Sequence, residues 1–127
     1  MKRRGILNAE LSRGLARLGH GHQVVVADSG LPLPRGADVI DLALVAGVPT
    51  FSQVLDAILA EIVVEGSLAA RESQGTVVAQ WLSARGLRPD LVPHEHFKEL
   101  LPAAALIVRT GEATSWANVA LRCGVPF

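Results

Sequence analysis

Apolar positions along the chain alternate between the spacing of a helix face and short continuous runs. Leu11, Leu15 and Leu18 recur three to four residues apart, as on one side of a helix. Asn8 precedes them and is a residue type that caps helices. The run 23–27 is short, apolar and β-branched, which is typical of a buried strand. The first third of the chain therefore predicts a helix ending near Gly19 and then a strand.

The rest of the chain repeats this alternation. We expect further strands over 39–45, 62–69, 91–92 and 104–108, and helices over 49–59, 76–84 and 94–101. The tail, 115–127, suits either type. Helices alternating with short apolar strands indicate one α/β domain over 1–127, with three layers (α/β/α) and a largely parallel or mixed central sheet.

The chain is more apolar than a small monomer needs. Half of its 127 residues are hydrophobic, although a domain of this size has much surface for its volume. Apolar surface in excess of the core is usually buried between subunits. We therefore expect a homo-oligomer.

Charge and cysteine content narrow the partners and the compartment. Twelve Lys and Arg balance twelve Asp and Glu without a basic run, so neither nucleic acid nor an anionic membrane is expected as a partner. The basic start is not followed by the apolar stretch of a signal peptide, and no window approaches the ~20 apolar residues of a membrane span. Cys123 is the only cysteine, which fits a reducing compartment. The cytoplasm is the expected location.

Two polar residues flank the first predicted strand. His20 lies where the first helix gives way to this strand, and Asp28 follows its far end on a loop rich in Gly and Pro. Ligands of open α/β sheets bind beyond the carboxyl ends of strands, which is where Asp28 lies. Alternatively, His20 is a helix-end residue that binds the last carbonyls, and Asp28 is a turn residue. The residues alone leave both interpretations open and do not place His20 beside Asp28.

The segment 94–98 contains two histidines that do not form a metal site. His94 and His96 are two apart, a spacing that does not share a helix face and matches no usual two-histidine motif. No metal is therefore expected. His94 and Lys98 are four apart and would share a face, either as a donor and a cation for one ligand or as an ordinary exposed surface.

The C-terminal segment offers a second set of candidates. In an extended segment Trp116 and Asn118 would share one face, where a flat ring beside an amide suits a polyhydroxylated ligand. A core Trp and a turn Asn are the alternative. Cys123 lies among apolar residues and is expected in the core rather than as a nucleophile. No Walker or G-x-G-x-x-G phosphate loop is present.

Taken in order along the chain, these residues resemble the D-ribose pyranase family and its sister family, the L-fucose mutarotases. The resemblance runs nearly end to end. Its specific combination is L-G-H at 18–20, D-S-G-L-P-L-P at 28–34, H-E-H-F-K at 94–98 and R-T-G-E at 109–112; W-A-N at 116–118 also matches.

The resemblance implies an isomerase that interconverts the pyranose and furanose forms of D-ribose without a cofactor. It implies that His20 is the catalytic proton donor. The implied substrate-binding residues are Asp28, His94, Lys98, Trp116, Ala117 and Asn118. The triplet 116–118 normally begins with Tyr, whereas the indole N–H of Trp116 only donates, so the choice of sugar stays open.

The resemblance also implies an assembly. Members of the family form pentameric rings, often paired into decamers, with sugar pockets near subunit boundaries. Two alternatives stay open: an L-fucose-type mutarotase and a non-catalytic sugar-binding regulatory ring. The compact length and the loop 28–34 favour the pyranase.

Overall fold

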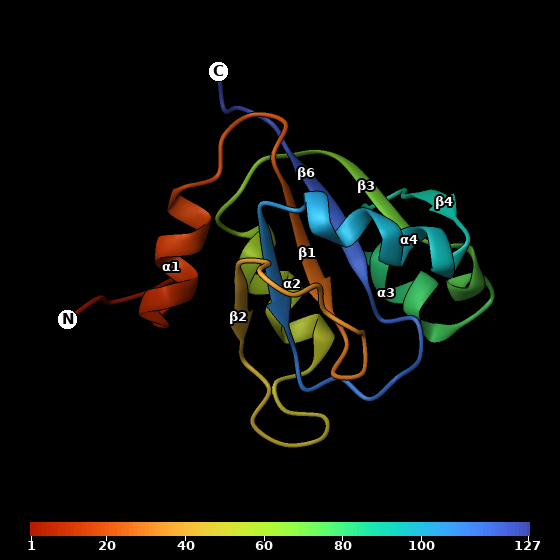
Figure 1. Ribbon diagram of the computed structural model, residues 1–127. Helices are drawn as coiled ribbons and strands as arrows, with labels where there is room; N and C mark the ends of the chain where they lie inside the picture. Colours follow the sequence, from red (N-terminus) through yellow and green to blue (C-terminus); the bar gives the residue numbers. More distant parts are fainter.

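A six-stranded sheet in the order β2-β5-β1-β6-β3-β4 forms the middle of the computed structural model, which describes residues 1–127 (Figure 1). The strands are β1 (Gln23–Ala27), β2 (Val39–Asp41), β3 (Val64–Ala70), β4 (Asp90–Val92), β5 (Leu106–Arg109) and β6 (Val119–Cys123). The pairs β1–β5, β2–β5 and β3–β4 are parallel, whereas β6 is antiparallel to both β1 and β3. Five strands therefore share one direction, and only β6 opposes them.

Helices cover both faces of this sheet. They are α1 (Ala9–Ala16), α2 (Phe51–Leu59), α3 (Val77–Ala84) and α4 (His94–Leu100), with 3-10 turns η1 (Arg71–Ser73) and η2 (Leu101–Ala103). Alternate side chains of β1 point to opposite faces: Val24 and Val26 join the core beneath α1, α2 and α3, whereas Val25 packs in the cluster beneath α4. The expected three-layer α/β/α fold with a mixed sheet is confirmed.

Local sequence explains where two of the helices begin. The side chain of Asn8 accepts a hydrogen bond of 2.9 Å from the N–H of Leu11, which caps α1 as expected. Thr50 and Gln53 form a reciprocal capping box at the start of α2. Each cap contributes about 1 kcal/mol to helix stability. None of the helices is long and apolar enough to cross a membrane.

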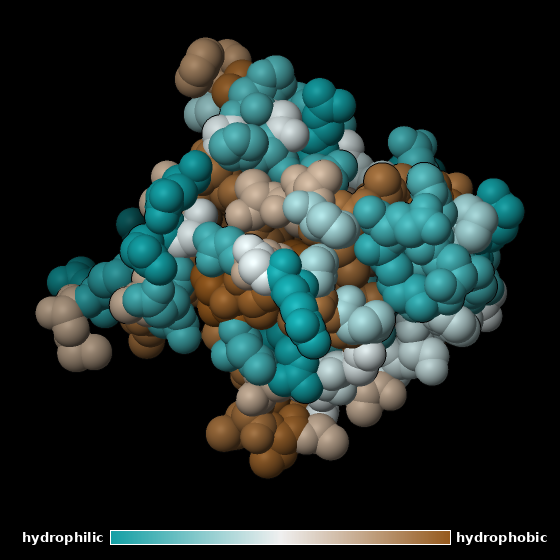
Figure 2. Space-filling view, viewed as in Figure 1, coloured by the Kyte–Doolittle hydropathy of each residue, from teal (hydrophilic) through white to brown (hydrophobic).

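The second apolar run forms a shorter strand than its pattern predicts. β2 ends at Asp41, whose carboxylate accepts from the N–H of Ala43 and turns the chain away from the sheet. Leu44 and Val45 therefore lie in a loop, 77% and 61% exposed. They contribute to the apolar surface over the loop after β2, at the bottom of the molecule in Figure 2. Apolar character alone did not distinguish this loop from a strand.

Other boundaries differ by a few residues. The first helix ends at Ala16 rather than near Gly19, and β3 begins at Val64 rather than Ile62. The ambiguous tail contains a strand, β6, which lies near the middle of the sheet. Its apolar residues are buried on both sides, so they lack the alternation that would mark a strand with one exposed face.

Candidate active site

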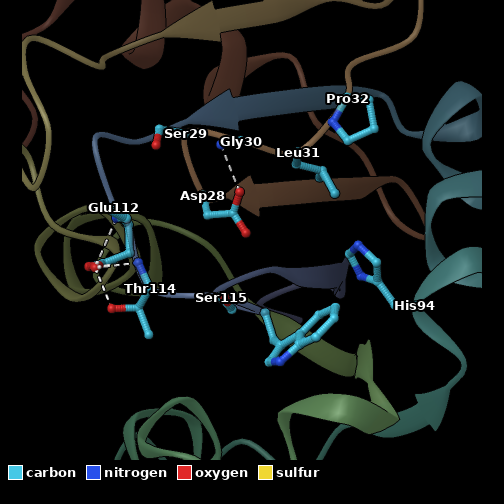
Figure 3. Close-up of a pocket in the computed structure, with 11 residues that line it drawn as sticks. Asp28, Ser29, Gly30, Leu31, Pro32, His94, Glu112, Thr114 and Ser115 are labelled. Atoms are coloured by element: carbon cyan, nitrogen blue, oxygen red, sulfur yellow. Dashed lines mark hydrogen bonds between the residues drawn. The ribbon is translucent and has the colours of Figure 1, made fainter.

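A hollow of about 340 Å³ opens where the loop after β1 meets the turn between β5 and β6 (Figure 3). It lies at the carboxyl ends of β1 and β5, where α/β sheets bind ligands. Only three of its eleven lining residues are hydrophobic, so it suits a small polar ligand. The lining consists of Asp28, Ser29, Gly30, Leu31, Pro32, His94, Glu112, Ala113, Thr114, Ser115 and Trp116.

Asp28 is held in this hollow by Asn118. One oxygen of the Asp28 carboxylate accepts from the Asn118 amide at 2.7 Å, and the other accepts from the N–H of Gly30 at 2.9 Å. The Asn118 side-chain oxygen accepts in return from the N–H of Asp28 at 2.8 Å. Asn118 is fully buried, and both ends of its amide are occupied by Asp28. The carboxylate is therefore oriented before any ligand arrives.

Two residues of the R-T-G-E segment form hydrogen bonds with the backbone on either side of Asp28. The guanidinium of Arg109 donates to the carbonyl of Ser29 and pairs with Asp41 at 2.9 Å. The hydroxyl of Thr110 donates to the carbonyl of Ala27 at 2.8 Å. Arg109 and Thr110 therefore support the loop and do not line the hollow.

Glu112 is a buried acid that organises the turn around the hollow. Its carboxylate accepts from the N–H of Phe51 at 3.1 Å, from the N–H groups of Ala113 and Thr114, and from the Thr114 hydroxyl at 2.9 Å. Burial acts to raise the pKa of Glu112, but these hydrogen bonds outweigh it and lower the pKa below the ordinary 4.5. Glu112 is therefore an ionised anchor between α2 and the turn.

His94 and Trp116 form the opposite wall. Their rings meet edge to face with centroids 4.9 Å apart, and Nδ1 of His94 is buried without a hydrogen-bond partner. Both carboxylate oxygens of Glu72 accept from the backbone N–H of His94, at 2.9 and 3.1 Å. Hydrogen bonds from the backbone N–H groups of Glu72 itself and of His94 lower the pKa of Glu72. A partnerless buried nitrogen in a polar hollow is a position for a ligand hydroxyl.

Trp116 has a backbone conformation that is unusual for its size. Its φ is +67°, and no other non-glycine residue in the chain has a positive φ. This left-handed conformation costs of order 1–3 kcal/mol for a bulky residue, and such strain gathers at functional sites. The turn therefore holds the indole at the hollow at a cost to stability.

The structure brings together only part of the predicted site. Asp28, His94 and Trp116 line one hollow, and Figure 3 shows Asp28 between Glu112 and His94. Ala117 and Asn118 are fully buried and lie outside the lining.

Lys98 and His20 lie apart from this hollow. Lys98, on α4, pairs with Glu95 at 2.7 Å. His20 precedes β1, whereas Asp28 follows it; five strand residues at about 3.3 Å each put roughly 16 Å between these ends. Nε2 of His20 instead lies 3.0 Å from a carboxylate oxygen of Glu65.

Sequence reasoning assigned no role to three acids that organise these polar groups: Glu65, Glu72 and Glu112. Glu112 carries a usable signal, because an acid between a buried strand and an apolar tail needs internal hydrogen bonds. Glu72 and Glu65 reach partners 22 and 45 residues away, which no local pattern indicates.

Comparison with known proteins shows which family the chain resembles. Residues 1–126 match the RbsD / FucU transport protein family. The chain is 54% identical to the D-ribose pyranase of Streptomyces avermitilis and 49% identical to that of Cutibacterium acnes, and each match covers all of both chains.

Solved structures agree. The structure of Bacillus subtilis RbsD complexed with D-ribose covers all of both chains with a TM-score of 0.93 and 40% identity. The fucose mutarotase from Streptococcus pneumoniae in complex with L-fucose also covers both chains fully, with a TM-score of 0.81 and 24% identity, which extends the likeness to the fold alone. The resemblance stated from the motifs is confirmed: the chain belongs to the RbsD / FucU transport protein family.

Proposed function

We propose that the chain is a D-ribose pyranase, a cofactor-free isomerase that interconverts the pyranose and furanose forms of D-ribose. The observation that carries this is the hollow with its oriented Asp28 carboxylate and the partnerless Nδ1 of His94. These groups offer a charged acceptor and a ring nitrogen to sugar hydroxyls. Identity of about half to named D-ribose pyranases over the full length supports the same sugar.

The reaction moves protons without changing oxidation state. The anomeric hydroxyl loses its proton as the bond from C1 to the ring oxygen breaks, and that ring oxygen gains a proton. A different hydroxyl then adds to the C1 carbonyl and releases its proton, while the carbonyl oxygen is protonated. Histidine exchanges protons near neutrality, so His20 is the proposed proton donor.

The remaining roles follow from where each residue lies. Asp28 accepts hydrogen bonds from sugar hydroxyls as a charged group. His94 contributes its buried Nδ1, and Trp116 contributes a flat apolar surface beside it. Lys98 follows His94 by one helical turn but lies apart from the hollow and pairs with Glu95, so its proposed sugar-binding role rests on the family motif alone. Of the triplet 116–118, Ala117 and Asn118 are buried behind the lining, and Asn118 acts through Asp28.

His20 and Asp28 lie at opposite ends of β1 within one chain, so in this proposal assembly brings His20 of one copy to Asp28 of another. In a homo-oligomer, a pentameric ring or a decamer of two such rings, His20 of a second copy closes the hollow of the first. The imidazole side chain of His20 is 59% exposed, so it is accessible to another subunit. Leu44, Val45 and Val48 are exposed apolar side chains that such contacts would cover. The proposed location is the cytoplasm, which fits the unpaired Cys123.

Saturation-transfer NMR tests this function directly. Irradiating a pyranose signal of D-ribose should attenuate the furanose signals in the presence of the protein, at catalytic concentrations. L-fucose serves as the comparison sugar, with exchange between its anomers as the readout. Binding of ribose without accelerated exchange would indicate a sugar-binding regulator, and faster exchange of fucose than of ribose would indicate a mutarotase.

A further inference from the structure

His20 is adjacent to side chains from two strands that are distant in sequence. Its Nε2 lies 3.0 Å from Oε2 of Glu65 in β3, and the other oxygen of that carboxylate lies 2.9 Å from Nε of Arg122 in β6. The N–H of Gly21 donates to the carbonyl of Cys123 at 2.8 Å, which holds the turn against the end of β6. One carboxylate therefore joins an imidazole and a guanidinium.

Glu65 occupies an irregular position in the sheet. Val64 pairs with Cys123 and Gly66 pairs with Arg122, so Glu65 is an extra residue in β3 without its own partner in β6. Such bulges change the direction of a side chain and are over-represented next to active sites. The direction of Glu65 toward His20 thus depends on a specific feature of the backbone.

The Glu65–His20 hydrogen bond determines which nitrogen of His20 carries the proton. A carboxylate only accepts, so Nε2 must donate to Glu65. A neutral imidazole has one proton, and with that proton on Nε2 the lone pair is on Nδ1. Nδ1 of His20 makes no hydrogen bond within the chain, so it is free to face a ligand.

The other polar groups near His20 do not replace Glu65 as its hydrogen-bond partner. Arg122 occupies the second oxygen of Glu65, and the Nδ1 of His22 accepts from the N–H of Gly19 at 3.0 Å. Asp90 lines the same pocket as Glu65 without a hydrogen bond to His20. Burial, with a smaller effect of the Glu65 charge, raises the pKa of the Cys123 thiol, so this thiol stays protonated.

We infer that Glu65 is a positioning residue for His20, which holds the proton on Nε2 and makes Nδ1 the atom that exchanges protons with the sugar. The inference rests on the proposed catalytic role of His20. Arg122 assists by fixing the carboxylate of Glu65.

The tautomer is measured on the unaltered protein. Magic-angle-spinning 15N NMR of histidine-labelled protein should show His20 with a protonated Nε2 and an unprotonated Nδ1, with the signal assigned by its loss in His20→Gln. A protonated Nδ1 in neutral His20 would overturn the inference. This measurement does not depend on whether any Glu65 variant folds.

Substitution of Glu65 tests the consequence for catalysis. The amide in Glu65→Gln can donate or accept, so it no longer selects a tautomer, and we expect a mixture of both forms. The kcat for D-ribose exchange should fall about tenfold with KM nearly unchanged, because orientation and not binding is lost. An unchanged kcat would overturn the inference.

Glu99→Gln is the matched control. Glu99 also pairs with an exposed histidine, His96, at 3.3 Å, but on α4. This variant should keep kcat within about twofold, because the histidine that Glu99 contacts, His96, has no role in the proposed reaction. The His20→Ala variant distinguishes the proposed role of His20 from that of Glu65. Full exchange in His20→Ala refutes the proposed function of His20, whereas inactive His20→Ala with fully active Glu65→Gln refutes only the role of Glu65.

Discussion

The two ends of β1 hold their polar side chains in different ways. At the carboxyl end, Asp28 is fixed by Asn118, which is fully buried. At the amino end, the side chains of His20 and Glu65 pair in the open, 59% and 35% exposed. A hydrogen bond to a charged group contributes about 1.5–3 kcal/mol, whereas an exposed ion pair contributes about 0–1 kcal/mol.

This difference indicates how the site is divided. The Asp28 end is a hollow that a single chain builds and orients by itself. At the other end, His20 is the proposed proton donor, and a single chain leaves its side chain exposed. In the proposed function, assembly joins one end of each type, so binding depends on one copy and proton transfer on another.

The largest expected effect is at the open end. His20→Ala should lower the rate of pyranose–furanose exchange by at least about 100-fold, because the proton-transferring group is lost. The free energy of unfolding should change by less than about 0.5 kcal/mol, since the side chain is exposed. Saturation-transfer NMR and urea denaturation measure the two quantities. Exchange at the wild-type rate would remove His20 from the mechanism.

At the Asp28 end, Asn118→Asp should affect both binding and stability. It places a second carboxylate about 2.7 Å from Asp28, and the two repel unless they share a proton. We expect a loss of about 2–4 kcal/mol of unfolding free energy at pH 8 and roughly tenfold weaker ribose binding, both partly recovered at pH 5. Urea denaturation and calorimetry at both pH values test this.

Asn8→Asp is the matched control for that substitution. A carboxylate caps a helix as well as an amide does, so its stability should change little between the two pH values. Equal behaviour of the two variants would contradict the account of Asn118.

A smaller effect on the free energy of unfolding is expected at Glu112, the buried acid beside the hollow. The lowered pKa of Glu112 means that its contribution is present above pH 4.5 and is lost as the pH falls through the lowered value. Glu112→Gln should therefore cost about 1–3 kcal/mol at pH 7, and the deficit against the natural chain should shrink near pH 3.5. Urea midpoints at both pH values check this. A deficit that grows on acidification would have the wrong sign.

The smallest effect concerns the wall of the hollow. Trp116→Tyr adds a hydroxyl that accepts as well as donates, and it keeps a flat ring against His94. KM for D-ribose should fall by up to about threefold while kcat is unchanged, because this end binds the sugar. Steady-state exchange rates measure both constants. A changed kcat with constant KM would contradict the division between the two ends.

Much of the fold could be predicted because its signals are local. The Asn8 cap, the strand over 23–27 and the position of Asp28 depend on neighbouring residues. β6 was ambiguous because a strand buried on both faces lacks alternation. The exposed Leu44 and Val45 extended the apparent second strand for the opposite reason, since apolar residues also occur in surface loops.

The site was less accessible to sequence reasoning because its contacts are distant. Asp28 and Asn118 are 90 residues apart, and only the antiparallel placement of β6 beside β1 brings them together. The family motifs nevertheless contain Asp28, His94 and Trp116, which the structure brings together in one hollow. The placement of His20 and Asp28 at opposite ends of the first strand was predicted from the sequence, whereas the contact of His20 with Glu65 was not.

Complementation between two inactive variants tests the shared site most directly. His20→Ala and Asp28→Asn, co-expressed with different tags and purified by both, should form mixed assemblies in which some sites combine an intact His20 with an intact Asp28 from a neighbour. Random mixing predicts about a quarter of the natural exchange activity, while each variant alone stays inactive. Mixed assemblies as inactive as their parents would contradict a site built from two copies.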